Sequence, residues 1–212
     1  MQRKKGIKIC GLTRLKDVLL VQKFGADYYG FILYGDSPRN ISIELLKKLI
    51  KPININQCVI VDVLPSLNKL KLLVNMGFEN FQIHIPKNTD FNKIESFTKI
   101  LGKSSLWLAP ELNYLSSFKP KFLDFANTII IDSYSKSKIG GTGKTGDWIG
   151  FKHLNEKYPN ISWGLAGGLN PENIKEAQDK SGASLLDINS GIEISPGIKD
   201  PKLIELLFKS IT

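Results

Sequence analysis

The residues of this chain that could carry out chemistry are a few polar side chains at the ends of apolar, strand-like segments. Asp132 follows the β-branched segment Thr128 to Ile131, and Cys10 is the last residue of the apolar segment that begins at Gly6. A carboxyl group on a partly apolar rim can stay protonated and serve as a general acid, and a thiolate can serve as a base. Position alone leaves alternatives open, because a lone aspartate can cap a helix and a lone cysteine is usually an inert hydrophobe.

The stretch after Asp132 is rich in glycine and ends in the run GTGKT. A phosphate-binding P-loop requires G-x-x-x-x-G-K-[ST], and counting back from Gly143 places Lys138 where the first glycine should stand. We therefore reject the P-loop reading. Gly140, Gly141 and Gly143 predict instead a loop whose backbone can approach a ligand closely, with a surface loop of no function as the alternative.

Further candidates lie at the ends of other strand-like segments. They are Arg39, Gln82, His84 and Asp187, together with the loop residues Gly167, Gly168, Ser190 and Gly191. Backbone N–H groups in two neighbouring glycine-containing loops can bind an anion, so these loops predict a phosphate site, with tight turns as the alternative. His84 alone is more typical of a hydrogen-bonded rim histidine than of a catalyst.

The composition is that of an ordinary globular enzyme, with 42% hydrophobic and 23% charged residues among 212. The two cysteines, Cys10 and Cys58, lie in apolar segments, which predicts a reducing, cytoplasmic setting without disulfides, and we assign Cys58 no chemistry. The net charge of +9 raises the alternative of a nucleic-acid-binding protein, but the lysines are spread along the chain rather than clustered. No segment is long and apolar enough to predict a membrane span or a secretory signal.

Strand-like and helix-like segments alternate from one end of the chain to the other. The expected strands are Gly6 to Cys10, Tyr28 to Tyr34, Cys58 to Val63, Phe81 to Ile85, Leu106 to Ala109, Thr128 to Ile131, Trp163 to Ala166 and Leu185 to Ile188. Eight such β-then-α units favour a single (β/α)₈ barrel domain over residues 1–212, with a doubly wound sheet as the alternative.

Helix-start signals support this alternation. We expect Thr13, Ser42 and Ser66 to cap helices, and Asn170-Pro171-Glu172 to open another. The region Tyr114 to Phe125 shows only a weak helical pattern, and a further helix should start near Asp147.

Several motifs together resemble the phosphoribosylanthranilate isomerase family of tryptophan biosynthesis. They are KICGLT, GADYYGFILYGDSPRNIS, FQIH, the stretch from Asp132 to Trp148, LAGGLNPEN and DINSGIEISPGIKD, which follow the family's order along almost the whole chain. The resemblance implies a (β/α)₈ barrel that converts N-(5-phosphoribosyl)anthranilate to 1-(2-carboxyphenylamino)-1-deoxyribulose 5-phosphate by an Amadori rearrangement. It implies no cofactor, no metal and a small phosphorylated substrate. We expect no nucleic-acid or membrane partner, and a monomer or homodimer, between which the sequence does not decide.

The resemblance also implies roles for individual residues. Cys10 would be the general base, Asp132 the general acid and Arg39 the partner of the anthranilate carboxylate. Gly167, Gly168, Ser190 and Gly191 would bind the phosphate, with Gln82, His84 and Asp187 lining the sugar site. A histidine-pathway isomerase, which performs a similar rearrangement, is expected to use two aspartates, and the cysteine at residue 10 argues against it.

Three positions depart from the family pattern. Ile85 and Gly146 stand where the family usually has glycine and phenylalanine, and VIVDV replaces VFVN at the end of the third strand. The last change leaves open whether Asp62 or Val63 takes the position of the polar residue.

Overall fold

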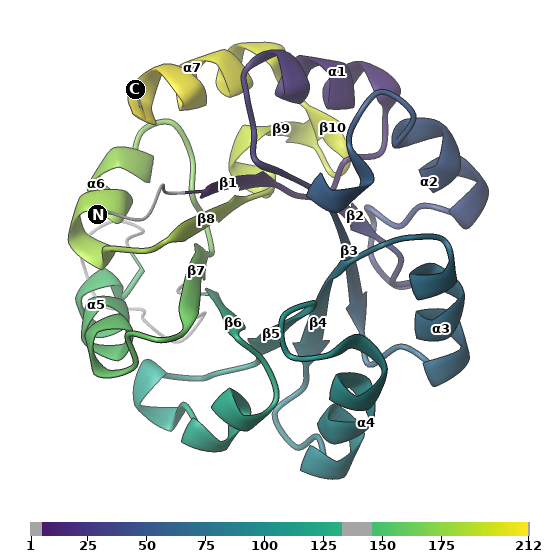
Figure 1. The fold of residues 1–212 in the computed structure, drawn as a ribbon. Helices are drawn as coiled ribbons and strands as arrows, with labels where there is room; N and C mark the ends of the chain where they lie inside the picture. Colours follow the sequence, from purple (N-terminus) through teal and green to yellow (C-terminus); the bar gives the residue numbers. More distant parts are fainter. Residues whose placement is uncertain (1–5, 133–145, 212) are drawn as a thin grey trace.

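Eight parallel strands close into a barrel in the computed structural model, which describes residues 6–132 and 146–211 (Figure 1). Each strand pairs with its neighbours in chain order, and β1 pairs with β8 to complete the ring. The strands are β1 Gly6–Ile9, β2 Tyr28–Ile32, β3 Cys58–Val63, β4 Asn80–Ile85, β5 Leu106–Pro110, β6 Thr128–Asp132, β7 Ser162–Ala166 and β8 Leu185–Ile188. The predicted closed barrel is confirmed, and the predicted strands differ from these bounds by at most two residues.

Seven α-helices surround the barrel in the described part of the chain (Figure 1). They are α1 Leu15–Lys23, α2 Ile43–Leu49, α3 Leu67–Asn75, α4 Phe91–Leu101, α5 Trp148–Lys157, α6 Ile174–Ser181 and α7 Pro201–Ile211. The weakly helical region after β5 forms two 3₁₀ segments, Leu115–Ser117 and Pro120–Asp124, instead of an α-helix. Pro120 explains the break, because its ring fixes the backbone and removes an N–H donor.

The helix-start predictions are partly confirmed. Ser42, Ser66 and Asp147 each accept a hydrogen bond from a backbone N–H in the first turn of α2, α3 and α5. Thr13 was a wrong prediction, since α1 begins after Arg14 and the Thr13 hydroxyl donates to the carbonyl of Gly197 at 2.5 Å. Asn170 accepts from two backbone N–H groups of a turn, and α6 begins only at Ile174.

Side chains alternate between the barrel interior and the layer beneath the helices, as strand geometry requires. On β1, Ile7 and Ile9 join the large apolar core between strands and helices, whereas Cys10 belongs to the small cluster inside the barrel. Lys8, two residues before Cys10 on the same face, is completely buried. The barrel interior therefore holds charged and polar groups as well as apolar ones.

A short hairpin follows β8 and connects it to the start of the chain. Its strands β9 Glu193–Ser195 and β10 Ile198–Lys199 pair antiparallel. Gly197 accepts the hydrogen bond from Thr13, and Arg14 donates to the Lys199 carbonyl at 3.1 Å. The first and last β/α units are thus joined by side-chain contacts in addition to the β1–β8 ladder. Across residues 6–132 and 146–211, no helix combines the length and apolar character needed to cross a membrane.

Candidate active site

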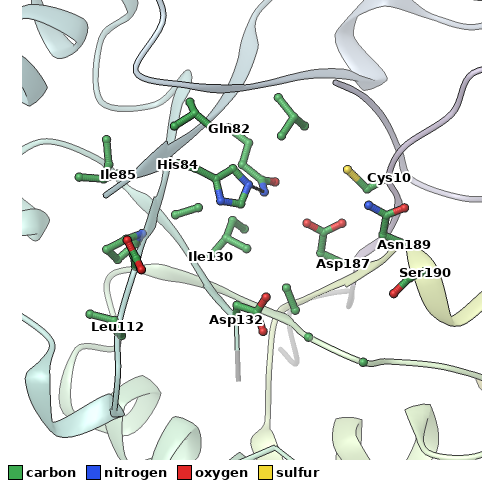
Figure 2. Close-up of a pocket in the computed structure, with 18 of the residues that line it drawn as sticks. Cys10, Gln82, His84, Ile85, Leu112, Ile130, Asp132, Asp187, Asn189 and Ser190 are labelled. Carbon is green, nitrogen blue, oxygen red and sulfur yellow. Dashed lines mark hydrogen bonds between the residues drawn. The ribbon is translucent and has the colours of Figure 1, made fainter. Parts of the chain in front are cut away.

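A pocket of about 820 Å³ opens at the carboxyl ends of the strands (Figure 2). Nine of the ten predicted site residues line it: Cys10, Gln82, His84, Asp132, Gly167, Gly168, Asp187, Ser190 and Gly191. The tenth, Arg39, is not among the described residues that line the pocket. The volume is within the range of small-molecule sites, so the predicted residues converge on one ligand-sized space.

Strand alternation explains why these side chains meet. Gln82 and His84 are two residues apart on β4 and therefore point into the barrel together. Asp187 lies opposite Lys8 in the β1–β8 ladder, and Lys8 precedes Cys10 by two residues on the same face. Figure 2 shows Cys10 and Asp187 on one side of the pocket and Gln82 and His84 on the other.

The Cys10 side chain lies deep in the pocket wall with only 4% of its surface exposed. Gly30 on β2 provides the space, because a Cβ atom there would lie 2.8 Å from the Cys10 sulfur. Burial raises the pKa of the Cys10 thiol, and the charge of Asp187 adds to this effect, whereas Lys8 and Lys199 oppose it. The thiol is therefore harder to ionise in the free protein than an exposed cysteine.

Lys8 and Asp187 form a buried ion pair directly below Cys10. The ammonium donates to both carboxylate oxygens, at 2.8 and 2.7 Å, and neither side chain is more than 6% exposed. Burial acts to lower the pKa of Lys8, but the attraction of Asp187 and Cys10 outweighs it and the pKa is raised. Lys8 thus keeps its positive charge inside the barrel. From the sequence, Lys8 is only a candidate cation for the Cys10 thiolate and is not among the predicted site residues, because the sequence does not show the ion pair that fixes it.

Gln82 and His84 form a second polar pair, whose Nε2 atoms are 3.2 Å apart. The Oε1 atom of Gln82 is buried and has no hydrogen-bond partner within the described residues. The His84 side chain is exposed to the open pocket, but the protein around the ring removes part of its hydration, which lowers its pKa, and repulsion by Lys8 lowers it further. His84 is therefore held neutral, and the pair can exchange hydrogen bonds with a polar ligand.

Asp132 stands at the end of β6, where its side chain is exposed and lines the pocket. Ile130, two residues earlier on the same strand face, also lines the pocket and provides an apolar floor beside it (Figure 2). The predicted glycine loop containing Gly140, Gly141 and Gly143 lies outside the described residues.

The loops after β7 and β8 pack tightly against each other. Gly167 and Gly168 have φ angles of +96° and +66°, a backbone region that favours glycine. A Cβ atom on Gly191 would lie 2.0 Å from the carbonyl oxygen of Leu169, so only glycine permits this approach. The two predicted anion-binding loops therefore form a continuous backbone surface at one end of the pocket.

Arg39 lies beside the pocket, in an ion-pair network with the hairpin. Its Nε and Nη2 atoms donate to the carboxylate of Glu193 at 2.6 to 3.1 Å. Glu193 also binds the buried ammonium of Lys199 at 2.9 Å, and Lys199 donates to the carbonyl and side chain of Asn189. Because Asn189 lines the pocket, this network connects Arg39 to the site.

The structure also resolves the positions that depart from the expected pattern. Val63 lines the pocket, whereas Asp62 faces the helices and forms an ion pair with Lys69 at 2.6 Å. Ile85 is buried at the end of β4. Cys58 is a free, buried thiol whose pKa is raised to about 12 by burial, which agrees with giving it no chemical role.

The arrangement suits proton transfer on an anionic small molecule. A thiol, a carboxyl group and a neutral imidazole surround one space, and a glycine-lined backbone surface closes one end of it. Within the part of the chain that the structure describes, no three His, Cys, Asp or Glu side chains are grouped to hold a metal ion.

Comparisons with known proteins agree with the geometry. The family model described as N-(5′-phosphoribosyl)anthranilate (PRA) isomerase matches residues 7–210. Curated proteins named N-(5′-phosphoribosyl)anthranilate isomerase from Petrotoga mobilis and Aquifex aeolicus are 35% and 33% identical to this chain. The aligned regions cover 94% of this chain and 93% of the Petrotoga protein, and 96% of both chains for Aquifex.

Solved structures give the same result. The phosphoribosyl anthranilate isomerase of Thermotoga maritima superposes with a TM-score of 0.78 at 27% identity over 98% of both chains. Another isomerase structure, in complex with reduced 1-(o-carboxyphenylamino)-1-deoxyribulose 5-phosphate, has a TM-score of 0.78 at 26% identity, also over 98% of both chains. A 3-hexulose-6-phosphate synthase shares the fold alone, with a TM-score of 0.63 at 12% identity over 98% of this chain and 100% of that one.

Proposed function

Because the chain belongs to the N-(5′-phosphoribosyl)anthranilate isomerase family, it is an isomerase of tryptophan biosynthesis, and we propose that Cys10 and Asp132 transfer the protons of its reaction. The enzyme converts N-(5-phosphoribosyl)anthranilate, a small phosphorylated substrate, to 1-(2-carboxyphenylamino)-1-deoxyribulose 5-phosphate. Cys10 is the general base in this proposal, and Asp132 is the general acid.

The Amadori rearrangement needs one proton delivered and one removed. Asp132 protonates the ribose ring oxygen as the C1–O bond breaks, which leaves a Schiff base between C1 and the anthranilate nitrogen. The Cys10 thiolate then takes the proton from C2, and the electron pair of that C–H bond neutralises the iminium to give an enolamine. Tautomerisation of the enolamine yields the ketone.

The observation that carries this assignment is that Cys10 and Asp132 line the same pocket as the two glycine loops. A phosphate bound at Gly167, Gly168, Ser190 and Gly191 would hold one end of the substrate and bring the sugar between the acid and the base. Asp187, Gln82 and His84 line the space between them, and the unpartnered Oε1 of Gln82 is suited to accept a hydrogen bond from a sugar hydroxyl.

Arg39 remains our candidate for binding the anthranilate carboxylate, but the structure shows that Glu193 already binds one edge of its guanidinium. Glu193 occupies Nε and Nη2, so the substrate would use Nη1, which these bonds leave available, or displace Glu193. A guanidinium bound on one edge by a carboxylate can still donate from the other edge.

The remaining expectations concern the setting of the enzyme. We propose a single domain over residues 1–212 in the cytoplasm, without a nucleic-acid partner, cofactor or metal. The two free thiols suit a reducing compartment. A monomer or a homodimer is consistent with the fold, and one Thermotoga maritima relative is described as dimeric.

The direct test is turnover of freshly generated substrate by wild type, Cys10→Ser and Asp132→Asn. Removal of an acid or a base typically costs about 10²- to 10⁴-fold, so each variant should lose at least roughly a hundredfold in kcat. Cys58→Ala and Asp124→Asn are matched controls on a thiol and a carboxylate outside the pocket, and both should remain active. Loss of less than tenfold in either site variant would contradict that residue's role.

A further inference from the structure

The buried ion pair between Lys8 and Asp187 lies next to the thiol that the proposed mechanism uses. We propose that Lys8 is a positioning residue whose ammonium, held in place by Asp187, stabilises the thiolate form of Cys10. The inference rests on the proposed function of Cys10 as the base, and it explains how a deeply buried thiol can serve in that role.

The geometry places the ammonium where it can act. Lys8 and Cys10 are two residues apart and point to the same side of β1. The Lys8 side chain is completely buried and is fixed by two hydrogen bonds of 2.7 and 2.8 Å to Asp187. An ammonium has three donors, so the two bonds to Asp187 leave a third for the groups around it.

Charged groups face Cys10 from several elements, and their signs differ. Lys8 on β1 and Lys199 on the hairpin favour the thiolate, and Arg39 after β2 interacts attractively with it. Asp187 on β8 disfavours it, while His84 on β4 lines the same pocket but is held neutral. Of these charges, Lys8 has the largest effect on Cys10, although burial of the thiol outweighs it in the free protein.

The pairing with Asp187 both preserves the positive charge of Lys8 and limits how strongly that charge stabilises the Cys10 thiolate. Without Asp187 the buried ammonium would lose the interaction that offsets its desolvation, because an unpaired buried lysine tends to lose its proton. With Asp187 present the charge is retained, but part of its field at Cys10 is cancelled. The ion pair therefore keeps a cation beside the thiol at the cost of some thiolate stabilisation.

The decisive comparison is between the protein with its ion pair intact and the double variant Lys8→Met/Asp187→Asn, both in a Cys58→Ala background. Neither protein leaves one charge of the pair buried without its partner. Ultraviolet absorbance of the thiolate is followed against pH in the free protein, and subtracting the titration of each protein's Cys10→Ser counterpart removes the tyrosine contribution and leaves that of Cys10. We expect the midpoint of the protein with the intact pair to lie roughly half a pH unit or more below that of the double variant, because a nearby cation lowers a thiol pKa by about one unit or more and Asp187 cancels part of that effect.

Two controls complete the experiment. Circular dichroism over the same pH range shows that both proteins stay folded, and Lys71→Met, which removes an exposed lysine, should leave the midpoint unchanged. Equal midpoints in the two test proteins would overturn the proposal and reduce Lys8 to a structural partner of Asp187. Failure of the base assignment itself would appear separately, because Cys10→Ser would then retain turnover whatever the thiolate midpoints of the two test proteins are.

Discussion

The two sides of the pocket differ in charge. On the side formed by β1, β8 and the hairpin, Lys8, Asp187, Glu193 and Lys199 are buried and paired, and they surround Cys10 and Arg39. On the side formed by β3 to β5, most of the lining is apolar or neutral, with Gln82 and neutral His84 among Val61, Val63, Ile85, Ala109, Pro110 and Leu112. The charged lining residue on this side, Glu111, is exposed after the end of β5. Figure 2 shows Gln82, His84, Ile85 and Leu112 on this side of the pocket.

This difference indicates that one side of the barrel supplies electrostatic stabilisation and the other supplies shape and hydrogen bonding. Buried charges are costly unless they are paired, and functional sites are where such groups concentrate, so we infer that this side supplies the electric field that acts on Cys10. The other side provides shape and hydrogen bonding without a buried charge that lines the pocket. We call these the charged wall and the uncharged wall, and the following predictions test how far the distinction holds.

The largest effect should come from breaking the central ion pair of the charged wall. Asp187→Leu leaves Lys8 buried without a counter-charge, and loss of one partner of such a pair typically costs about 3–5 kcal/mol. Lys8→Met/Asp187→Leu removes this ion pair altogether and should recover most of that stability. Urea unfolding measures both. Ile85→Leu, a volume-conserving change on the uncharged wall, should cost less than about 1.5 kcal/mol, and a similar cost for Asp187→Leu would refute the distinction.

The next effect concerns the glycine loops at the end of the pocket. Gly191→Ala places a methyl group 2.0 Å from the Leu169 carbonyl oxygen, so the two loops must separate. Overpacking typically costs about 1–3 kcal/mol, and if this cost falls on a phosphate site formed by the two loops, KM should rise by roughly five- to 150-fold. Gly35→Ala, where nothing lies within 4 Å, is the matched control. An unchanged KM and an unchanged inhibition constant for inorganic phosphate would place the phosphate elsewhere.

A smaller effect should follow from moving the thiol itself. Gly30→Ala introduces a Cβ atom 2.8 Å from the Cys10 sulfur and 2.9 Å from its Cα, so Cys10 must shift toward the pocket. Displacement of a reacting group by a fraction of an ångström should lower kcat on the order of tenfold, with KM little changed. Steady-state kinetics beside Gly35→Ala would reveal it, and full kcat in Gly30→Ala would argue against the close fit of Cys10.

The smallest effect tests whether His84 belongs to the uncharged wall. Its pKa in the folded protein is lowered, so the unfolded chain binds the proton more readily as the pH falls through about 6.5. The free energy of unfolding should therefore decrease as the pH drops below this value, until the folded imidazole also protonates. His84→Gln should flatten this part of the pH dependence, as measured by urea unfolding. Stability that rises on acidification in wild type relative to His84→Gln would show that the imidazole is stabilised as a cation.

Local patterns were sufficient to predict the barrel and most of the pocket. Strands such as Leu106–Pro110 are apolar on both faces, and the carboxyl ends of the strands identify rim residues such as Asp132 and His84 without knowledge of the packing. The weakly helical region before β6 was harder to predict, because Pro120 interrupts the helical pattern and the chain forms short 3₁₀ turns there.

Long-range pairing accounts for what the sequence could not predict. Thr13 has the chemistry of a helix cap, but Gly197, 184 residues away, accepts its hydroxyl hydrogen bond instead. The pairing of Arg39 with Glu193 across 154 residues could not be foreseen from either segment. The role of Asp62 was also undecidable, since only the register of β3 shows that Val63 faces the pocket.

The ion pair between the first and last strands has a consequence for how the enzyme is made on the ribosome. Lys8 and Asp187 are separated by 179 residues, so at about 5–20 residues per second the lysine waits roughly 10–35 s for its carboxylate to be synthesised. Until then a nascent barrel cannot enclose Lys8 without burying an unpaired cation. The charged wall should therefore be the last part of the enzyme to assemble, and a stalled nascent chain that lacks β8 should expose its β1 segment to chaperones and proteases.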